Sequence, residues 1–212
     1  MKFKTQLLHS SAGADAQTGA LTTPIYQSST FTYGSAADGK ARFAGEQPGF
    51  IYSRMGNPTV QALEQQLANL EGADEALVVA SGMAAVSSIF YALVSAGDEV
   101  AFIDPVYGGT AAFLVNTLSR AGIKVSRYLS DDDLVANINP GTKLVLFEPI
   151  TNPNLKVADY RKVKAAAAKT GAITVCDNTF LTPYLFKPLE HGIDLVMHSA
   201  TKYLSGHGDI IA

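Results

Sequence analysis

The sequence predicts an α/β fold, with a mostly parallel sheet that carries helices on both faces. Beyond about residue 76, apolar runs of strand length alternate with stretches whose apolar residues recur at helical spacing. Strands that alternate with helices are joined by crossovers, which make the strands parallel and place the helices on the faces of the sheet. The composition agrees, because the 212 residues are 47% hydrophobic and 17% charged, as suits a globular protein with a sizeable core.

The regular part of the chain begins with a helix after Asn57. Asn57 can cap this helix, Pro58 fits its first turn, and Gly72 can end it. Acidic residues at 131–133 favour another helix start, because they would meet the positive end of the helix dipole. The expected strands are 76–80, 99–103, 123–128, 143–148, 172–176 and 194–198, and further helices are expected near 82–94, 110–121, 131–138 and 158–170.

The two ends of the chain depart from this pattern. Residues 1–57 have weak periodicity and many small side chains, so we expect an extended arm there and a large domain over residues 58–212. The last residues, 210–212, resemble the middle of another apolar strand with no helix or cap after it. We therefore expect the chain to be a fragment whose large domain is incomplete.

Composition excludes several classes of function. The net charge of -3 offers no basic surface for nucleic acid, and the single cysteine, Cys176, excludes an internal disulfide and a cysteine-rich metal site. Residues 76–97 are uncharged and long enough to span a bilayer, but Ser81-Gly82 interrupts them, and a buried strand, turn and helix fit better. No apolar signal core follows Met1, so the cytoplasm is the expected compartment.

Polar and ionisable residues follow the expected strands at the points where they end. In open α/β sheets, ligands bind beyond the carboxyl ends of the strands, so these segments should gather at one edge and form a site. The segments are 81–83, 104–107, 148–152, 177–178 and 199–202.

Lys202 is the most informative residue of this set. A lysine at a strand end could form a Schiff base with an aldehyde cofactor, although an isolated one is more often a surface residue. Here Ser199 and Thr201 add hydroxyl groups that can bind a phosphate. Gly82, at a turn from a strand into a helix, would let backbone N–H groups approach a phosphate, but it is part of neither a P-loop nor a G-x-G-x-x-G motif.

Two further strand-end residues have a structural and a chemical interpretation. Asp177 could cap the next turn, or its carboxylate could face a pyridinium nitrogen and keep that ring protonated. Tyr107, beside Gly108 and Gly109, could be a core aromatic or a ring stacked on a flat cofactor.

Together these segments resemble the Cys/Met-metabolism enzymes that depend on pyridoxal 5'-phosphate (PLP). The resemblance runs from about Leu21 to the last residue and rests on motifs in a fixed order. It implies the large domain of a fold type I, aspartate aminotransferase-like transferase, with PLP as cofactor and the smaller C-terminal domain absent. The motifs are Tyr52-Ser53-Arg54-Met55-Gly56-Asn57-Pro58-Thr59, Ser81-Gly82-Met83-Ala84-Ala85, Tyr107-Gly108-Gly109-Thr110, Thr151-Asn152-Pro153-Asn154, Asp177-Asn178-Thr179 and Ser199-Ala200-Thr201-Lys202-Tyr203-Leu204-Ser205-Gly206-His207.

The resemblance also implies a role for each site residue. Lys202 would hold the cofactor and move protons between substrate carbons. Tyr107 would stack on the ring and serve as acid or base, and Asp177 would pair with the ring nitrogen. Asn152 would lie near the phenolic oxygen. The remaining expected contacts are to the phosphate: the amides of Gly82 and Met83 and the hydroxyls of Ser199 and Thr201 from the same chain, and Tyr52 with Arg54 from a neighbouring subunit.

The expected activity is γ-elimination on a sulfur amino acid, with methionine γ-lyase as the nearest member. Ile51 stands where cystathionine lyases tend to carry an acid, and Gly206-His207-Gly208-Asp209 and the stretch 43–51 look like methionine γ-lyase, although Gly109 replaces a cysteine of that enzyme. O-acetylhomoserine sulfhydrylase and cystathionine γ-synthase or γ-lyase are the alternatives. We expect a homotetramer, a dimer of dimers with shared active sites, that acts on a small amino acid.

Two other classes remain open. The arginine that binds the substrate carboxylate in this family has no counterpart by motif here, so the chain could be a catalytically silent PLP-binding fragment. A metal hydrolase is the third possibility, but the spacing of His9, His191, His198 and His207 matches no recognisable ligand set.

Overall fold

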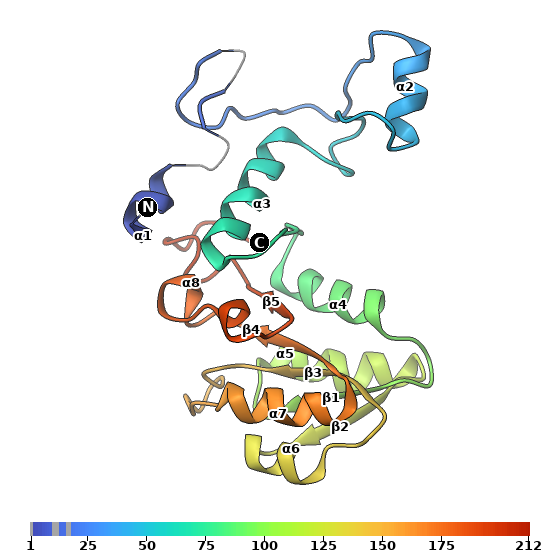
Figure 1. The fold of residues 1–212 in the computed structure, drawn as a ribbon, viewed down its shortest axis with the longest axis vertical. Coiled ribbons are helices and arrows are strands. Elements are labelled where there is room, and N and C mark those ends of the chain that lie inside the picture. The colour runs from blue at the N-terminus through green and yellow to red at the C-terminus, as the bar shows by residue number, and fades with distance from the viewer. Residues whose placement is uncertain (1, 10–12, 16–17) are drawn as a thin grey trace. The chain divides into compact units, whose positions relative to one another are not determined.

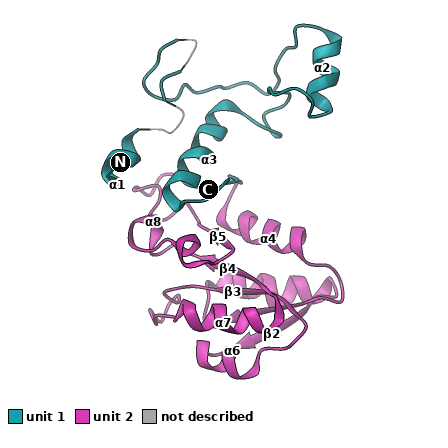
Figure 2. Cartoon of the chain, in the orientation of Figure 1, with its two compact units in different colours: residues 1–78 teal, residues 79–212 magenta. Residues whose placement is uncertain are grey.

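A computed structural model describes residues 2–9, 13–15 and 18–212. The chain forms two compact units, residues 1–78 and 79–212, which are coloured separately in Figure 2. The boundary expected after residue 57 falls inside the first unit.

The described residues of the first unit form three helices, α1 (Phe3–Leu8), α2 (Ala36–Phe43) and α3 (Pro58–Glu71). The ends of α3 are as predicted: the Asn57 side chain accepts from the Thr59 N–H at 2.9 Å, and Gly72 adopts the left-handed conformation with φ 73°. The expectation of an extended arm is wrong for α1 and α2. Ser35 caps the start of α2, since its hydroxyl accepts a hydrogen bond from the Asp38 N–H.

The second unit is an α/β domain around a five-stranded sheet whose strands are all parallel (Figure 1). The strand order is β2-β1-β3-β4-β5. The strands are β1 (Glu99–Ile103), β2 (Lys124–Tyr128), β3 (Thr142–Phe147), β4 (Ile173–Asp177) and β5 (Leu195–Met197). The helices are α4 (Gly82–Leu93), α5 (Gly108–Ala112), η1 (Phe113–Leu118), α6 (Asp131–Asn137), α7 (Tyr160–Thr170), α8 (Thr182–Leu185) and η2 (Pro188–His191).

Alternate residues of the central strands face opposite cores, as the pleat of a strand requires. Phe102 and Leu146 belong to the core that includes residues of α4 and η1, whereas Ala101 and Val145 belong to the core that includes residues of α6 and α7. The sheet therefore has helices on both faces (Figure 1), and the predicted fold class is confirmed.

Three predicted elements differ from the structure. Residues 76–80 do not form a strand. The Val78 N–H donates to the Glu64 carboxylate and not to the carbonyl of a neighbouring strand. Residues 210–212 are not a strand either, since the Ala212 backbone bonds to Thr201. The helix expected over 110–121 begins at Gly108 and continues as the π-helix η1.

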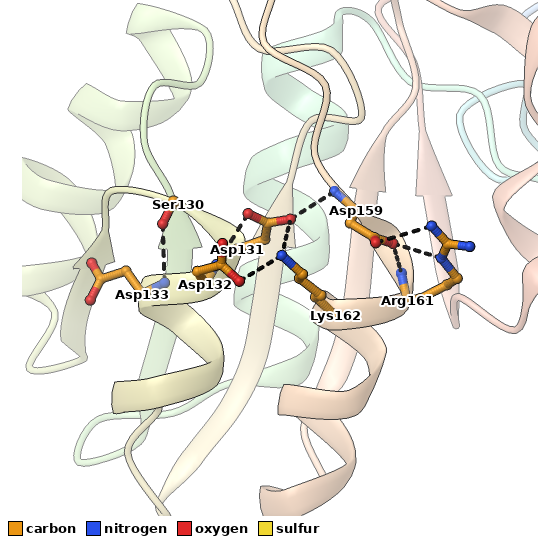
Figure 3. A network of polar contacts seen from close by, with 7 residues as sticks. All are labelled: Ser130, Asp131, Asp132, Asp133, Asp159, Arg161 and Lys162. Carbon is orange, nitrogen blue, oxygen red and sulfur yellow. Dashed lines mark hydrogen bonds and ion pairs between the residues drawn. The ribbon is translucent and has the colours of Figure 1, made fainter.

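The acidic run at 131–133 begins α6, as its sequence predicts (Figure 3). The Ser130 hydroxyl caps the helix by accepting from the Asp133 N–H. Lys162 of α7 pairs with Asp132 at 2.6 Å, and Asp131 accepts from the Asp159 N–H at 3.0 Å. These contacts tie the starts of α6 and α7 together, and they lie apart from the residues described next.

Candidate active site

A pocket of about 270 Å³ lies where the strands of the second unit end. Its lining comes from the start of α4 and from the segments that follow β1, β3, β4 and β5, as the rule for open α/β sheets predicts. Eight residues proposed from the sequence line it: Gly82, Met83, Tyr107, Asn152, Asp177, Ser199, Thr201 and Lys202.

The N-terminus of α4 forms one wall of this pocket. The Ser81 hydroxyl caps the helix through the Ala84 N–H at 3.1 Å, which leaves the Gly82 and Met83 N–H groups in the first turn, where a helix offers no backbone acceptors. Gly82 is buried against Ser199: a Cβ at Gly82 would lie 2.6 Å from the Ser199 Cβ and 3.0 Å from its Cα. Only glycine lets the helix start approach Ser199 this closely, and free N–H groups at a helix start are donors of the kind that bind anions.

Asp177 ends β4 and turns its carboxyl group to the pocket. One oxygen accepts from the Thr179 hydroxyl at 2.5 Å and from the Thr179 N–H at 3.1 Å. Burial raises the pKa of Asp177, while the bonds from Thr179 and the nearby His198 act in the opposite direction. A cationic group at this wall of the pocket would stabilise the ionised carboxylate.

Tyr107 lies beside the pocket with its side chain half exposed. Its ring runs close to Gly109, where a Cβ would lie 2.6 Å from the Tyr107 Cε1 and 3.3 Å from the Met83 sulfur. A side chain at position 109 would therefore have to displace the ring. Glycine at position 109 therefore leaves the space that the Tyr107 ring occupies in this chain.

Glu148 belongs to the site but received no role from the sequence. It follows β3, is buried, and accepts from the Tyr107 and Asn152 N–H groups. Burial is the main cause that raises its pKa to about 7, and the charge of Asp177 adds to it. The sequence signal that could have identified Glu148 is an acidic residue directly after the apolar strand β3.

Lys202 and Thr201 lie in the turns after β5. The Lys202 side chain is exposed and lines the pocket, and its N–H donates to the Ser199 carbonyl at 3.1 Å. The Thr201 hydroxyl donates to the Ala212 carbonyl and accepts from the Ala212 N–H, both at 2.9 Å. A phosphate would have to replace one of these bonds to reach that hydroxyl.

Tyr52 and Arg54 are the two proposed site residues that do not line this pocket. They belong to the first unit, where the Arg54 guanidinium carbon lies 4.9 Å from the centre of the Tyr52 ring, in a cation–π contact.

Two other kinds of site are absent from the described parts of the chain. No set of three histidine, cysteine or acidic side chains is grouped so as to hold a metal ion. The helices described are all too short or too polar to cross a membrane.

Comparison with known proteins identifies the family. The profile of the Cys/Met metabolism PLP-dependent enzymes matches residues 4–212. The chain is 46% identical over 213 residues to L-methionine gamma-lyase of Pseudomonas putida and 42% identical over 212 residues to cystathionine beta-lyase of Lactococcus lactis subsp. cremoris. Each alignment covers 99% of this chain and 53% of the relative, so the chain spans about half the length of these enzymes.

Solved structures agree with the sequence relatives. A putative O-acetylhomoserine (thiol)-lyase from Campylobacter jejuni, which carries a pyridoxyl-lysine phosphate, matches with a TM-score of 0.92 and 38% identity. Cystathionine gamma-lyase from Lactobacillus plantarum, complexed with L-serine, matches with a TM-score of 0.90 and 38% identity. Both matches cover the whole chain and 53% of the neighbour. The chain belongs to the Cys/Met metabolism PLP-dependent enzymes.

Proposed function

We propose that the protein binds PLP in this pocket and holds it covalently through Lys202. The observation that carries the proposal is the convergence of three groups at one sheet edge: an exposed lysine, a helix start packed too tightly for any residue but glycine, and a desolvated carboxylate. Each of them complements a different part of PLP, namely its aldehyde, its phosphate and its ring nitrogen.

The phosphate fits the wall formed by α4. Gly82, Met83 and Ser199 line the pocket, and Gly82 packs against Ser199, so their N–H and hydroxyl groups would be donors to the phosphate, whose negative charge the helix dipole favours. Asp177 suits the ring nitrogen, since a protonated ring would lower the raised pKa of this carboxyl group. Asn152 would serve the phenolic oxygen.

When bound, PLP supplies the electron sink that makes carbon–sulfur cleavage possible. Asp177 would hold the ring nitrogen in its protonated form. Tyr107 would pack its ring against the cofactor and exchange a proton near the leaving group, and the Lys202 amine would carry protons between substrate carbons.

We assign γ-elimination on methionine as the first candidate reaction, with methanethiol, 2-oxobutyrate and ammonia as products. The identity to enzymes named L-methionine gamma-lyase supports it. Cleavage of cystathionine or sulfhydrylation of O-acetylhomoserine is the second candidate, supported by relatives of those names and by glycine at position 109, where methionine γ-lyases carry a cysteine.

In the assay, the PLP-loaded protein is incubated with methionine, cystathionine or O-acetylhomoserine as substrate. The products measured are 2-oxobutyrate, ammonia and released thiol, and Lys202→Ala is the control. Fastest product formation from methionine supports the first candidate, and a preference for another substrate supports the second. No turnover with PLP retained on Lys202 would identify a catalytically silent PLP-binding chain.

The proposed assembly is a homo-oligomer, a dimer of dimers in the cytoplasm, in which Tyr52 and Arg54 reach the phosphate of a neighbouring subunit. Arg54→Ala should then weaken PLP retention far more than Arg161→Ala, whose guanidinium pairs with Asp159 at the surface. Mixing Arg54→Ala and Lys202→Ala subunits should restore part of the activity, because one hybrid site would be whole. Hybrids that form without any recovery would refute shared sites.

A further inference from the structure

One carboxyl group joins two loops of the candidate site. Glu148 is 6% exposed, and its Oε1 accepts from the Tyr107 N–H at 2.6 Å while its Oε2 accepts from the Asn152 N–H at 2.8 Å. Tyr107 follows β1 and Asn152 follows β3, and these two strands are neighbours in the sheet. Each oxygen of Glu148 therefore fixes the backbone of a residue that carries a proposed cofactor contact.

The chemistry of this arrangement requires a carboxylate. An ionised carboxylate offers two acceptor oxygens, whereas a glutamine side chain offers one oxygen and an NH₂ group that would face an N–H. Burial of a carboxyl group is unfavourable unless hydrogen bonds compensate it, and bonds to the ionised form are roughly twice as strong as neutral ones. The two backbone donors offset part of this cost, and burial still holds the pKa of Glu148 above its ordinary value.

Tyr107 depends on its backbone anchor, because its side chain is 48% exposed and weakly enclosed. The ring lies against Gly109, where an added Cβ would be 2.6 Å from the Tyr107 Cε1. A change at Glu148 would therefore move the ring through the backbone without touching it.

We infer that Glu148 is a positioning residue whose carboxylate holds the Tyr107 and Asn152 loops in one arrangement, and whose protonation loosens both loops together. The inference rests on the proposed function only for what Tyr107 and Asn152 do toward PLP. The coupling of the two loops is a property of the protein itself.

The pKa of Glu148 lies in a pH range in which the protein can be studied in solution. Burial, followed by the charge of Asp177, raises its pKa to about 7, while the two N–H bonds oppose the shift. The other titratable groups that line the same pocket are Tyr107, Asp177 and Lys202.

The test follows the Tyr107 and Asn152 backbone amide signals of the PLP-free, ¹⁵N-labelled chain by NMR as pH changes. Both signals should shift with one common midpoint near pH 7, should stop titrating in Glu148→Gln, and should titrate unchanged in Glu190→Gln, which alters an exposed carboxylate beside Lys187. Separate midpoints, or a shared titration that persists in Glu148→Gln, would overturn the inference. If Glu148→Gln fails to fold, the unsubstituted chain alone still shows whether the Tyr107 and Asn152 signals share one midpoint.

A second readout connects the coupling to the cofactor. Glu148→Gln should weaken PLP affinity roughly ten- to hundredfold, the loss expected for one or two charge-assisted bonds, with no such loss in Glu190→Gln. Unchanged affinity would overturn the positioning role. If no variant and no unsubstituted protein bind PLP, the proposed function fails while the amide titration still decides the coupling.

Discussion

Replacing Gly82 by alanine perturbs the proposed phosphate site with one methyl group. The added Cβ would lie 2.6 Å from the Ser199 Cβ and 3.0 Å from the Ser199 Cα. Carbon atoms normally approach to about 3.5–4.0 Å, so a gap of roughly 1 Å must open. Because the Ser199 Cα belongs to the backbone, the start of α4 and the segment after β5 have to separate.

Two free energies compete in this substitution. Alanine is favoured over glycine in a helix by up to about 1 kcal/mol, whereas overpacking costs about 1–3 kcal/mol. We expect a small net loss of stability. The loss of PLP affinity should be larger, because the Gly82 and Met83 N–H groups move away from the Ser199 hydroxyl. Loss of one or two charge-assisted bonds at about 1.5–3 kcal/mol each corresponds to a decrease of at least about tenfold.

The assay is a PLP titration monitored by absorbance, together with urea denaturation of the PLP-free chain. Gly141→Ala is the matched control, since nothing lies within 4 Å of a Cβ at that glycine and its φ is not in the left-handed region. Gly141→Ala should bind PLP as the original chain does. A Gly82→Ala chain that binds PLP with an affinity within twofold of the original would refute the close-packed phosphate site.

Three further predictions concern charge. The pKa of Glu148 is raised to about 7, so its stabilising contribution is present below its unfolded value of about 4.5 and is lost as pH rises through 7. The free energy of unfolding of Glu148→Gln, relative to that of the original chain, should therefore rise by about 3 kcal/mol between pH 4 and pH 8. If the difference between the two chains does not change with pH, burial does not raise the pKa of Glu148. Asp177→Asn should raise the melting temperature of the PLP-free chain, because it removes a desolvated carboxylate, and it should weaken PLP binding. If stability and PLP affinity both rise or both fall, Asp177 is not the partner of the ring nitrogen. Lys162→Met should leave the denaturation midpoint nearly unchanged, since its ion pair with Asp132 is exposed and its pair with the partly buried Asp131 is long, at 3.9 Å. A large shift would show that these pairs stabilise the fold.

The parallel sheet was predictable because its strands are short apolar runs bounded by clear helix signals. Asn57 and Gly72 fix the ends of α3, and Gly171, with φ 71°, ends α7 in the same way as Gly72 ends α3. From the strand ends, the rule for open sheets also predicted that Lys202, Asp177 and other distant residues would line one pocket.

Other features depend on contacts that a sequence pattern does not contain. Residues 76–80 are apolar and strand-like, yet the Val78 N–H goes to Glu64, a helix residue. The role of Glu148 appears only when the loop after β1 is placed beside β3, since Tyr107 is 41 residues away. The expectation of an extended arm overlooked the Ser35 cap, because one capping residue gives little periodicity to detect.

The most direct test of the central claim is the location of PLP on the chain. Protein incubated with PLP is reduced with borohydride, digested and mapped by mass spectrometry, with Lys202→Ala as control. We expect a pyridoxyl group on Lys202, the lysine that lines the pocket with Ser199 and Asp177, and none in the control. A label on another lysine, or equal labelling of Lys202→Ala, would contradict it.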